Sequence, residues 1–543
     1  LKMIGDDIDG PHMARAREAI LAHGGAAAAN VFTRFQLALY GAGPWNAIPT
    51  MPVELMLVPR WFPVHLSRMS YWARTVIVPL LVLQAMKPCA RNPRGVHVPE
   101  LFLPHGSPAP KRAPHQSRGW ATFFGALDWL LKRADPLWPK ALRKRAIKAC
   151  EEFVIERLNG EDGLGAIYPA MANSVMMFDC LGYPPEHPHR AIARRSVEKL
   201  LVVKDDEAYC QPCVSPVWDT ALACHALLEA QGVEDAVARG LEWLKPLQVL
   251  DVKGDWADER PSVRPGGWAF QYRNDHYPDL DDTAVVVMAL DRAVKGDGSA
   301  EAIARGREWV ESLQSKNGGW GAFDADNAYY YLNNIPFADH GALLDPPTED
   351  VTGRCLGMLA QLGEPLDSPR MKAAIDYLER VQLKDGSWFG RWGVNYIYGT
   401  WSALAGLSAA GLDAQHPMMR KAAEWLIAIQ NADGGWGESC DSYKLEYAGY
   451  ESAPSTASQT AWALLGLMAA GEVDHPAVAR GIAYLQETQA EDGLWTQLHY
   501  TGGGFPRVFY LRYHGYPKFF PLWALARYRN LKASNTRRVA HGL

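Results

Sequence analysis

Several features that define common protein classes are missing from this chain of 543 residues. No apolar run reaches the roughly 18 residues that a membrane-spanning helix needs. The eight cysteines form no disulfide framework, a pattern typical of a reducing compartment. Cys210 and Cys213 make one C-x-x-C pair without a second pair, so neither a zinc site nor a redox site is expected. The net charge of −5 argues against a nucleic-acid partner.

Aromatic residues are abundant by contrast, with 20 Trp, 22 Tyr and 16 Phe. Many of them belong to an internal repeat in which an aromatic residue is followed by Gln five positions later and by Trp six positions after that. A fifth, degenerate copy contains Trp243, Gln248 and Trp256. The four clear copies are Trp309, Gln314 and Trp320; Tyr377, Gln382 and Trp388; Trp425, Gln430 and Trp436; and Tyr484, Gln489 and Trp495.

The segments between these repeats are typical of helices. Residues 351–362, 401–410 and 457–470 are rich in small and apolar side chains, and each is followed by a glycine that can stop a helix. Repeated helical hairpins without any alternating strand pattern predict an all-α fold, a closed ring of helix pairs known as an α/α barrel. We expect each Gln amide to bond backbone at an outer helix end and each Trp to stack over it.

Two helical domains are predicted, because the repeats are clear in 201–543 and degraded in 1–200. Residues 87–117 are rich in Pro, Arg and His and indicate a long loop. The chain opens at Leu1, within a polar helical pattern and not at a methionine, so we expect an N-terminal portion to be missing.

Residues 120–145 are a candidate membrane-binding segment within the first domain. Apolar residues recur there at helical spacing: Trp120, Phe123, Phe124, Leu127, Leu130 and Leu131, followed by Leu137 and Trp138. A basic cluster comes next: Lys140, Arg143, Lys144 and Arg145. An apolar helix bounded by Trp and followed by basic residues suits the bilayer interface. The alternative is an ordinary amphipathic surface helix packed on its own core.

Residues 277–284 carry three carboxylates within four positions, Asp279, Asp281 and Asp282, directly before the apolar stretch 285–290. Carboxylates this close in a low-dielectric site cannot all ionise, so at least one should keep its proton at neutral pH. A carboxylic acid held protonated is a candidate Brønsted acid. The same residues also fit a plain helix start, with Asp279 as N-cap and the other two in the first turn. The two interpretations are compatible, because a helix start is a good place to fix an acid.

Together, the Gln-Trp repeats and the D-x-D-D-T-A motif at 279–284 resemble one family, the bacterial squalene–hopene cyclases among the class II triterpene cyclases. The resemblance covers essentially the whole chain apart from its start. Further agreeing stretches are 215–220, 267–271, 390–400 and 504–510. The D-x-D-D-T-A form is similar to that of the squalene-using branch, and a D-D-x-x-D magnesium motif is absent from the sequence.

The resemblance implies acid-initiated cyclisation of squalene to a pentacyclic triterpene, hopene with some hopanol, without ionisation of a diphosphate. It implies no cofactor and no metal. The fold would be two α/α barrel domains with a large cavity between them. The expected partners are squalene drawn from the membrane, the membrane surface and a second copy in a homodimer, with the protein monotopic on the cytoplasmic face of the bacterial inner membrane.

For the acid motif, the resemblance implies that Asp281 is the proton donor and that Asp279 and Asp282 hold its geometry and acidity. The family places an ion pair behind this cluster, which Asp350 and Arg354 match at i,i+4 spacing. Arg354 departs from the His of familiar members. Because Arg is always charged, a cation there would favour ionised aspartates and so raise the acidity of the donor. A surface i,i+4 helix pair is the alternative.

Aromatic faces can stabilise a carbocation without bonding to it, each by about 2 kcal/mol when desolvated. The resemblance implies that six such residues line the cavity: Phe270, Trp218, Trp72, Trp392, Phe505 and Phe509. Hydrogen-bonding or lining tyrosines would be Tyr398, Tyr510, Tyr513 and Tyr516. Two positions depart from the family pattern, since Phe323 stands where Tyr is usual and Tyr168 replaces a Gln that helps hold the terminating water. Any single aromatic among these could instead be a core residue.

Two other functions are carried as alternatives. The first is the same acid chemistry on a shorter or modified isoprenoid, which differs only in cavity size. The second is a protein-binding helical toroid of the prenyltransferase or complement type. The three-carboxylate cluster argues against a toroid that only binds proteins, and the zinc ligand set of protein prenyltransferases is not evident in the sequence.

Overall fold

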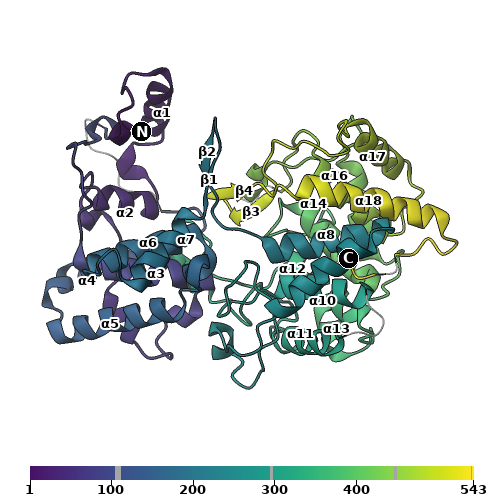
Figure 1. Cartoon of the computed structure of the whole chain (residues 1–543), viewed down its shortest axis with the longest axis horizontal. Helices are drawn as coiled ribbons and strands as arrows, with labels where there is room; N and C mark the ends of the chain where they lie inside the picture. Colours follow the sequence, from purple (N-terminus) through teal and green to yellow (C-terminus); the bar gives the residue numbers. More distant parts are fainter. Residues whose placement is uncertain (104–111, 294–297, 445–448, 540) are drawn as a thin grey trace. The chain divides into compact units, whose positions relative to one another are not determined.

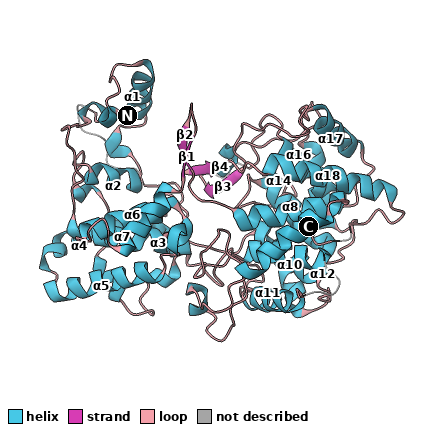
Figure 2. Ribbon diagram, in the orientation of Figure 1, coloured by secondary structure: helices cyan, strands magenta, loops and turns pink. Residues whose placement is uncertain are grey.

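The computed structural model describes residues 1–103, 112–293, 298–444, 449–539 and 541–543. Within these residues the regular secondary structure is almost entirely helical, which confirms the all-α prediction (Figures 1 and 2). The described strands form two short antiparallel hairpins: β1 (Leu201–Val203) with β2 (Ala208–Cys210), and β3 (Gly502–Phe505) with β4 (Phe509–Leu511). Among the described residues, no helix combines the length and apolarity needed to cross a membrane.

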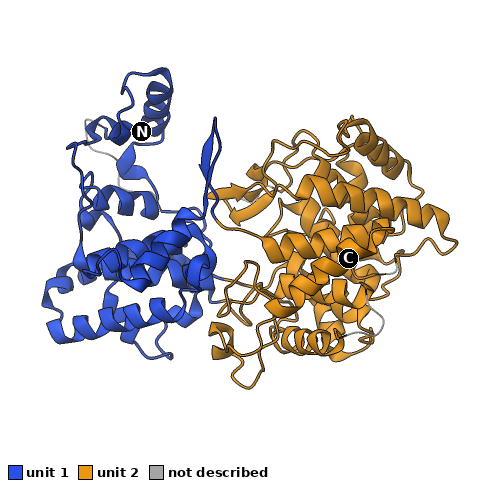
Figure 3. Cartoon of the chain, in the orientation of Figure 1, with its two compact units in different colours: residues 1–212, 329–344 blue, residues 213–328, 345–543 orange. Residues whose placement is uncertain are grey.

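The chain divides into two compact units (Figure 3). Unit 1 contains residues 1–212 and 329–344, and unit 2 contains residues 213–328 and 345–543. The segment 329–344 therefore belongs to unit 1, although it interrupts unit 2 along the sequence. A single domain boundary near residue 200 does not account for this segment. It is held there by hydrogen bonds from the backbone N–H of Ser70 to the carbonyl of Leu343 (2.9 Å) and from the indole of Trp72 to the carbonyl of Ala342 (2.7 Å).

Unit 2 is an α/α barrel, as the repeats predict. Its inner helices each pack on the next, and the last packs on the first, so that the ring is closed. They are α8 (Pro216–Ala230), α10 (Leu280–Ala293), α12 (Glu349–Gln361), α14 (Tyr396–Ala409), α16 (Ala457–Ala469) and α18 (Tyr516–Ala533). Outer helices cover them: α9 (Glu234–Leu244), α11 (Ala300–Ser312), α13 (Pro369–Val381), α15 (Pro417–Ala428) and α17 (Pro476–Glu487).

The inner helices carry apolar side chains on every face because both sides of the ring wall are buried. In α16, every residue is buried. Two of the predicted helices agree with the structure to within two residues at each end, whereas α14 begins at Tyr396, five residues before the predicted start at 401. The early start follows from Glu438, whose carboxylate accepts the backbone N–H groups of Asn395, Tyr396 and Ile397 and so caps a helix that lacks a local cap.

The Gln and Trp side chains tie the repeats together, as expected. The amide of Gln430 donates to the carbonyl of Gly434 in its own turn (2.7 Å) and to that of Ala477 in the next outer helix (2.9 Å). The indole of Trp436 donates to the carbonyl of Leu426, ten residues earlier at the end of α15 (2.8 Å). The same Gln bonds recur at Gln314 and Gln382, and the same indole bond recurs at Trp320, Trp388 and Trp495.

The degenerate copy uses a different Trp from the one predicted. Gln248 bonds like the other Gln residues, but the indole that donates to the outer helix end belongs to Trp268, which binds the carbonyl of Leu244 (2.8 Å). Trp256 instead meets Trp309 edge to face at 5.8 Å. The assignment of Trp256 was wrong because a longer loop separates Gln248 from its Trp, and spacing alone does not reveal such an insertion.

Unit 1 is a smaller helical assembly around α3 (Tyr71–Met86), which is buried over nearly its whole length. Helix α3 packs against α5 (Lys140–Glu156) and α6 (Tyr168–Cys180), and α6 packs against α7 (Pro188–Glu198). The remaining helices are α1 (Pro11–Ala22), α2 (Val31–Leu39) and α4 (Arg118–Ala134). Short 3₁₀ turns such as η4 (Val53–Leu57) and η7 (Asp135–Leu137) complete the connections.

Candidate active site

The inner helices of unit 2 share one register at their N-terminal ends. The hydroxyl of Thr283 in α10 accepts a hydrogen bond from the backbone N–H of Trp268 (2.9 Å). Equivalent bonds join Thr352 to Trp320, Thr400 to Trp388 and Thr460 to Trp436. The position two residues before each Thr is therefore equivalent from helix to helix, and it is occupied by Asp281, Asp350, Tyr398 and Ser458. The repeat thus brings first-turn side chains of different helices to the same end of the ring.

The three carboxylates of the acid motif are all buried at this end. Oδ1 of Asp279 accepts the backbone N–H groups of Asp281 (2.7 Å) and Asp282 (3.2 Å), so Asp279 caps α10 as the helix-start interpretation predicts. The backbone carbonyl of Asp279 also accepts the hydroxyl of Thr283 (2.6 Å). Asp281 and Asp282 occupy the first turn of the helix. The carboxyl groups that form the start of α10 are therefore the same ones that make up the candidate acid cluster.

Arg354 pairs directly with the central carboxylate. Its Nε donates to Oδ1 of Asp281 (2.6 Å), and its Nη2 donates to the hydroxyl of Tyr398 (2.6 Å). The guanidinium is fully buried and lies over three aromatic rings, with its central carbon 5.4 Å from the ring centre of Trp218, 5.2 Å from that of Tyr398 and 5.0 Å from that of Trp401. A surface helix pair is excluded for Arg354 because of this burial.

The expected ion pair between Asp350 and Arg354 is wrong in its partner. Asp350 uses its carboxylate to hold backbone instead, accepting the N–H groups of Arg391 (2.8 Å) and Trp392 (2.9 Å) on Oδ2. The i,i+4 spacing suggested a pair, but Asp350 sits at the very start of α12, next to the 390–392 loop that needs acceptors. Arg354 is therefore left to contact Asp281 on the neighbouring inner helix.

The three carboxyl groups differ in acidity because their neighbours differ. Burial raises the pKa of Asp281, but the Arg354 cation opposes this effect, and the result is a pKa of about 6. Burial also raises the pKa of Asp279 and of Asp282 well above the ordinary value, and in each case a neighbouring carboxyl group adds to the increase. Asp281 is therefore the strongest acid of the three, and the cluster holds protons at neutral pH, as the spacing predicts.

Several of the predicted aromatic residues contact one another in unit 2. The indole of Trp218 donates to the hydroxyl of Tyr516 (2.9 Å), and Tyr516 stacks on Tyr513 with ring centres 4.3 Å apart. Phe270 meets Tyr513 edge to face at 6.4 Å. Because Trp218 also lies beneath the guanidinium of Arg354, this group of rings is continuous with the acid cluster. The structure thus brings these aromatic faces beside Asp281, the predicted proton donor.

A second set of predicted aromatics flanks the 390–392 and 502–511 loops. Phe323 meets Trp392 edge to face at 6.1 Å, and Phe505 lies 5.3 Å from Phe509. Tyr510 stacks on the buried Tyr443 at 5.9 Å, and its hydroxyl donates to the carbonyl of Cys440, so its visible role is structural. The phenyl ring of Phe323 carries no hydroxyl, so it can pack against Trp392 but cannot form a hydrogen bond there.

Trp72 and Tyr168 lie in unit 1. Trp72 is buried in α3, with its indole bonded to the carbonyl of Ala342. Tyr168 begins α6 and remains 42% exposed, so its hydroxyl is accessible to solvent or ligand. The contacts of both are described within unit 1 alone.

Sequence reasoning missed Asp219 in α8, which is the equivalent of Asp282 one position before Thr220. Its Oδ2 accepts the hydroxyl of Ser215 (2.7 Å), whereas no hydrogen-bond partner for its buried Oδ1 is found among the described residues. Burial raises the pKa of Asp219 to about 6. An Asp-Thr pair occurs at two equivalent helix starts, 219–220 and 282–283, and this was the sequence signal that could have revealed Asp219.

Asp345 was missed as well. Its carboxylate accepts the backbone N–H groups of Ala322, Phe323 and Asp324 and so holds the turn that presents Phe323. Burial raises the pKa of Asp345 to about 7, while these three bonds lower it. The residue carries no motif of its own, so only the fold identifies its role.

Unit 1 contains an apolar cavity of about 500 Å³ beside α4. One face of α4 contributes to its wall through Phe124, Leu127 and Leu131. Other apolar side chains of α4 are exposed: Trp120 at 46%, Phe123 at 56%, Trp129 at 56% and Leu130 at 55%. The basic residue Arg143 is not free beside this helix, because it is paired with Glu54 (3.0 Å) and Asp135 (2.8 Å).

Comparison with known proteins gives matches over both units. The family described as "Squalene-hopene cyclase N-terminal domain" matches residues 1–206, and that described as "Squalene-hopene cyclase C-terminal domain" matches residues 214–530. The "Squalene--hopene cyclase" of Zymomonas mobilis subsp. mobilis is 64% identical over 100% of this chain and 84% of its own length. That of Bradyrhizobium diazoefficiens is 62% identical with the same coverage.

More distant relatives extend the comparison. The "Squalene--hopene cyclase" of Alicyclobacillus acidocaldarius subsp. acidocaldarius is 40% identical over 97% of this chain and 84% of its own length. Among solved structures, "ent-Copalyl diphosphate synthase from Streptomyces platensis" covers 94% of this chain and 98% of its own, at 15% identity and a TM-score of 0.43.

Proposed function

Because the chain belongs to the squalene–hopene cyclase family, we propose that it cyclises squalene to a pentacyclic triterpene, hopene with some hopanol. The observation that carries this proposal is the pairing of Asp281 with Arg354 beside a group of aromatic rings. Polyene cyclisation needs an acid strong enough to protonate an alkene, and walls that do not react with the resulting cation.

Asp281 is the proton donor in this scheme. Its carboxylic proton passes to one carbon of a terminal double bond, whose π electrons form the new C–H bond and leave a tertiary cation on the other carbon. Each following double bond attacks the cation and closes a ring. The last cation loses a proton to give hopene, or takes up water and then loses a proton from the added oxygen to give hopanol. No diphosphate leaves, so no metal is required for ionisation.

Arg354 stabilises the conjugate base of the donor. When Asp281 loses its proton, the carboxylate stays within 2.6 Å of the guanidinium Nε in a water-poor site, where the attraction between the charges is strong. Asp279 and Asp282 keep their protons because of burial and mutual repulsion, so they do not compete as anions for Arg354. The ring of Phe270, and the faces of Trp218 and Trp392 that Arg354 and Arg391 do not cover, would stabilise carbocations.

Incubating the purified protein with squalene, extracting the lipids and identifying the products by mass spectrometry tests the proposal. We expect hopene as the main product. Asp281→Asn should retain the fold and lose at least about a hundredfold in rate, since an amide cannot donate that proton. Conversion of a shorter isoprenoid and not of squalene would favour the alternative substrate class. Wild-type turnover in the Asn variant would remove Asp281 from the role of donor.

We also propose that unit 1 binds the membrane surface through α4 and takes squalene from it. Squalene is almost insoluble in water, so it must reach the enzyme from a bilayer. The exposed Trp120, Phe123 and Leu130 form an apolar face that suits insertion to the depth of the headgroup and acyl boundary. The cavity lined by Phe124, Leu127 and Leu131 of the same helix would receive the substrate. Lys140, Lys144 and Arg145 are exposed on α5 and would contact anionic headgroups.

The proposed location is the cytoplasmic face of the bacterial inner membrane, with the protein monotopic and dimeric. The eight free cysteines support a reducing compartment. Carbonate extraction of membranes from the source cells, followed by protease access from each side, tests the location. Sedimentation equilibrium in detergent tests the dimer, which a single species of the 60.1 kDa protomer mass would exclude.

A further inference from the structure

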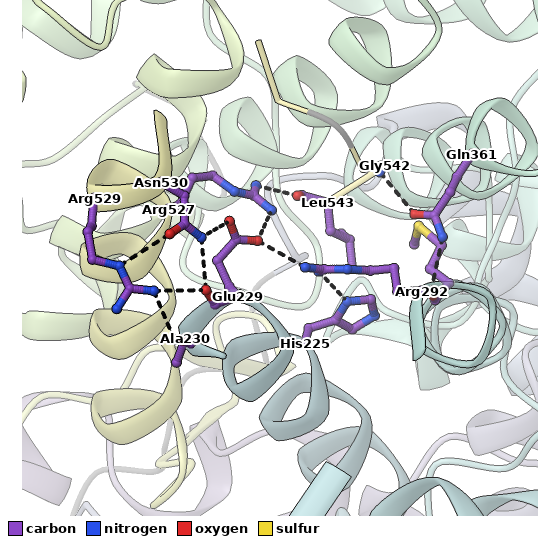
Figure 4. Close-up of polar contacts among 11 residues, drawn as sticks. His225, Glu229, Ala230, Arg292, Gln361, Arg527, Arg529, Asn530, Gly542 and Leu543 are labelled. Carbon is purple, nitrogen blue, oxygen red and sulfur yellow. Dashed lines mark hydrogen bonds and ion pairs between the residues drawn. The ribbon is translucent and has the colours of Figure 1, made fainter. Parts of the chain in front are cut away.

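A buried polar cluster lies at the end of the unit 2 ring opposite the acid motif (Figure 4). It contains His225 and Glu229 from α8, Arg292 from α10 and Arg527 from α18. Arg292 follows Asp281 by about three helical turns on the same helix. None of these residues takes part in the cyclisation proposed above, yet three of the helices that carry acid-site residues meet in this cluster.

Glu229 is shared by two guanidinium groups. Its Oε2 accepts from Nη2 of Arg292 (3.0 Å) and from Nη2 of Arg527 (3.1 Å), while its Oε1 accepts from the amide of Asn530 (3.2 Å). Burial acts to raise the pKa of Glu229, but the two cations lower it to about 2, so the carboxylate is ionised at any working pH. These bonds join α8, α10 and α18 through one side chain.

His225 is fully buried and makes a different contact with each neighbouring helix. Its Nδ1 lies 3.1 Å from Nη1 of Arg292, which can only donate, so Nδ1 is the accepting nitrogen. Its Nε2 then carries the hydrogen and donates to the backbone carbonyl of Val285 (2.9 Å). The ring stacks on Trp523 of α18 with centres 5.3 Å apart. Its neutral state and tautomer are therefore set by the fold.

The segment at 541–543 supplies further bonds. Arg527 donates to the backbone oxygen of Leu543, and the backbone N–H of Gly542 donates to Oε1 of Gln361 in α12 (3.1 Å). A Cβ atom at Gly542 would collide with the backbone of Gly357 in α12, so only glycine permits this approach. The cluster thus extends to a fourth inner helix.

The contact between His225 and Val285 is the one nearest to the acid. Val285 lies one turn after Asp281 in α10, and His225 lies two turns after Trp218 in α8. Buried ion pairs are weak evidence for stability, because desolvation offsets much of their attraction. They do impose geometry, since a shift of one helix would leave a buried charge without its partner.

We propose that this cluster is a positioning element for the proton-donating site, in which His225 holds the second turn of α10, and with it Asp281, in register with α8. The proposal rests on the function proposed above for Asp281. His225 touches no substrate in this scheme and acts only through the position of α10. Asp281 must place its proton against one carbon atom, and a misplacement of about 1 Å can reduce a rate by a hundredfold.

Three substitutions test the role of His225. His225→Phe keeps a ring to stack on Trp523 but removes both hydrogen bonds. His225→Asn, a milder change, is too short to reach Arg292 and Val285 together. His225→Gln can still accept from Arg292 and donate to Val285. Leu485→Ala in the outer helix α17 serves as the control, because it also removes buried contacts but touches no inner-helix polar group.

We expect kcat on squalene to fall about tenfold or more in the Phe and Asn variants, with KM nearly unchanged, and to recover in the Gln variant. Amide hydrogen exchange in 281–289 should be faster in the same two variants and close to wild type in the Gln variant. The control should lower the melting temperature by a similar amount while leaving kcat and this exchange unaltered. Assays are run well below the melting temperature of every variant.

The exchange measurement separates this proposal from the proposed function. If wild type does not convert squalene, the proposed function fails, while exchange still reports whether His225 holds α10. If kcat and exchange in the Phe and Asn variants match those of Leu485→Ala, His225 is an ordinary packing residue and the proposal is overturned. Failure of Gln to restore either quantity would also overturn it.

Discussion

At the scale of single residues, the three carboxyl groups of the acid motif are chemically alike and are distinguished by their contacts. Asp279 accepts hydrogen bonds from two backbone N–H groups, and Asp281 accepts one from the guanidinium of Arg354. For Oδ1 of Asp282, no hydrogen-bond partner is found among the described residues. The central one has a raised pKa and is also paired directly with a cation, which stabilises its ionised form. Proton donation is therefore a property of the surroundings and not of the residue type.

Replacing Arg354 should change the pH dependence of cyclisation. Asp281 must be protonated to act, so the rate should fall as the pH rises through its pKa of about 6. Arg354 lowers that pKa, so in Arg354→Leu the pKa should rise and the fall in rate should move to higher pH. The maximal rate should drop at least about tenfold, because the conjugate base loses its partner.

Arg354→Lys is the control for this prediction, since it retains the charge without the forked donor geometry. In the Lys variant, the pH at which the rate falls should lie nearer to that of wild type. An unchanged pH–rate profile in the Leu variant, with the fold intact by circular dichroism, would show that Arg354 supports the helix only.

Asp282 should make the protein less stable as pH rises. Its folded-state pKa is well above the ordinary value, because burial and the neighbouring Asp279 disfavour the charge. Below the ordinary pKa both states are protonated, whereas at higher pH the folded state must keep a proton that the unfolded chain releases. The cost grows by up to about 1.4 kcal/mol per pH unit until the folded-state pKa is reached.

Asp282→Asn removes this proton linkage. Its melting temperature relative to wild type should therefore be higher at pH 8 than at pH 5, which calorimetry at both values measures. A difference that is equal at the two pH values, or larger at pH 5, would contradict the raised pKa of Asp282.

At the scale of helices, the barrel is held by one set of bonds repeated around unit 2. In all but the last repeat, the Gln amide joins its own turn to the next outer helix. The Trp indole binds an outer helix end, and the Thr hydroxyl anchors an inner helix to the Trp backbone. Threonine of the D-x-D-D-T-A motif belongs to this set, so that Thr283 is an anchor of the helix that carries the acid. Repetition is thus what aligns the first turns of the inner helices.

Gln430→Leu should destabilise the barrel more than Gln489→Leu does. Gln430 makes two backbone bonds, one of them to the next outer helix, whereas for Gln489 the described bond stays within its own turn and the residue is exposed. Loss of this half-buried amide leaves two backbone carbonyls without their donor, at a cost of about 1–3 kcal/mol. Urea unfolding of the two variants measures the difference, and equal midpoints would show that the inter-repeat bond adds nothing.

At the scale of the whole molecule, the exposed and the cavity-lining side chains of α4 should be separable by mutation. Substituting Ser for the exposed Trp120, Phe123 and Leu130 should release the protein from anionic liposomes. Turnover of liposome-held squalene should fall severalfold, while turnover of detergent-solubilised squalene should change little. Apolar contact area drives such interfacial binding, so its loss should act on binding first.

Substituting Ser for the cavity-facing Phe124 and Leu127 should instead leave liposome binding intact and slow turnover of squalene from either source. Leu498→Ser in unit 2, where the side chain is 72% exposed, is the control for loss of an exposed apolar residue. If the Trp120, Phe123 and Leu130 variant still sediments with liposomes as the parent does, α4 is not the membrane anchor.

Local pattern was sufficient for the repeat, the all-α class, the barrel of unit 2 and the cap at Asp279. Each of these depends on spacing along the chain, and helix periodicity, turn glycines and capping residues act over a few positions. The family resemblance added the list of aromatic residues, of which Trp218, Phe270, Tyr513 and Tyr516 contact one another in unit 2.

Tertiary structure alone decided which partners the charged groups take. The i,i+4 spacing of Asp350 and Arg354 predicts a pair along one helix, yet Asp350 binds the 390–392 backbone and Arg354 contacts Asp281 on the neighbouring inner helix. Tertiary structure also decided that Trp268, and not Trp256, makes the indole bond of the degenerate repeat. It likewise decided that residues 329–344 belong to unit 1. Sequence determines which groups lie near one another along the chain, but a buried charge selects its partner from all groups that the fold brings within reach, because leaving it unpaired costs more than any local preference supplies.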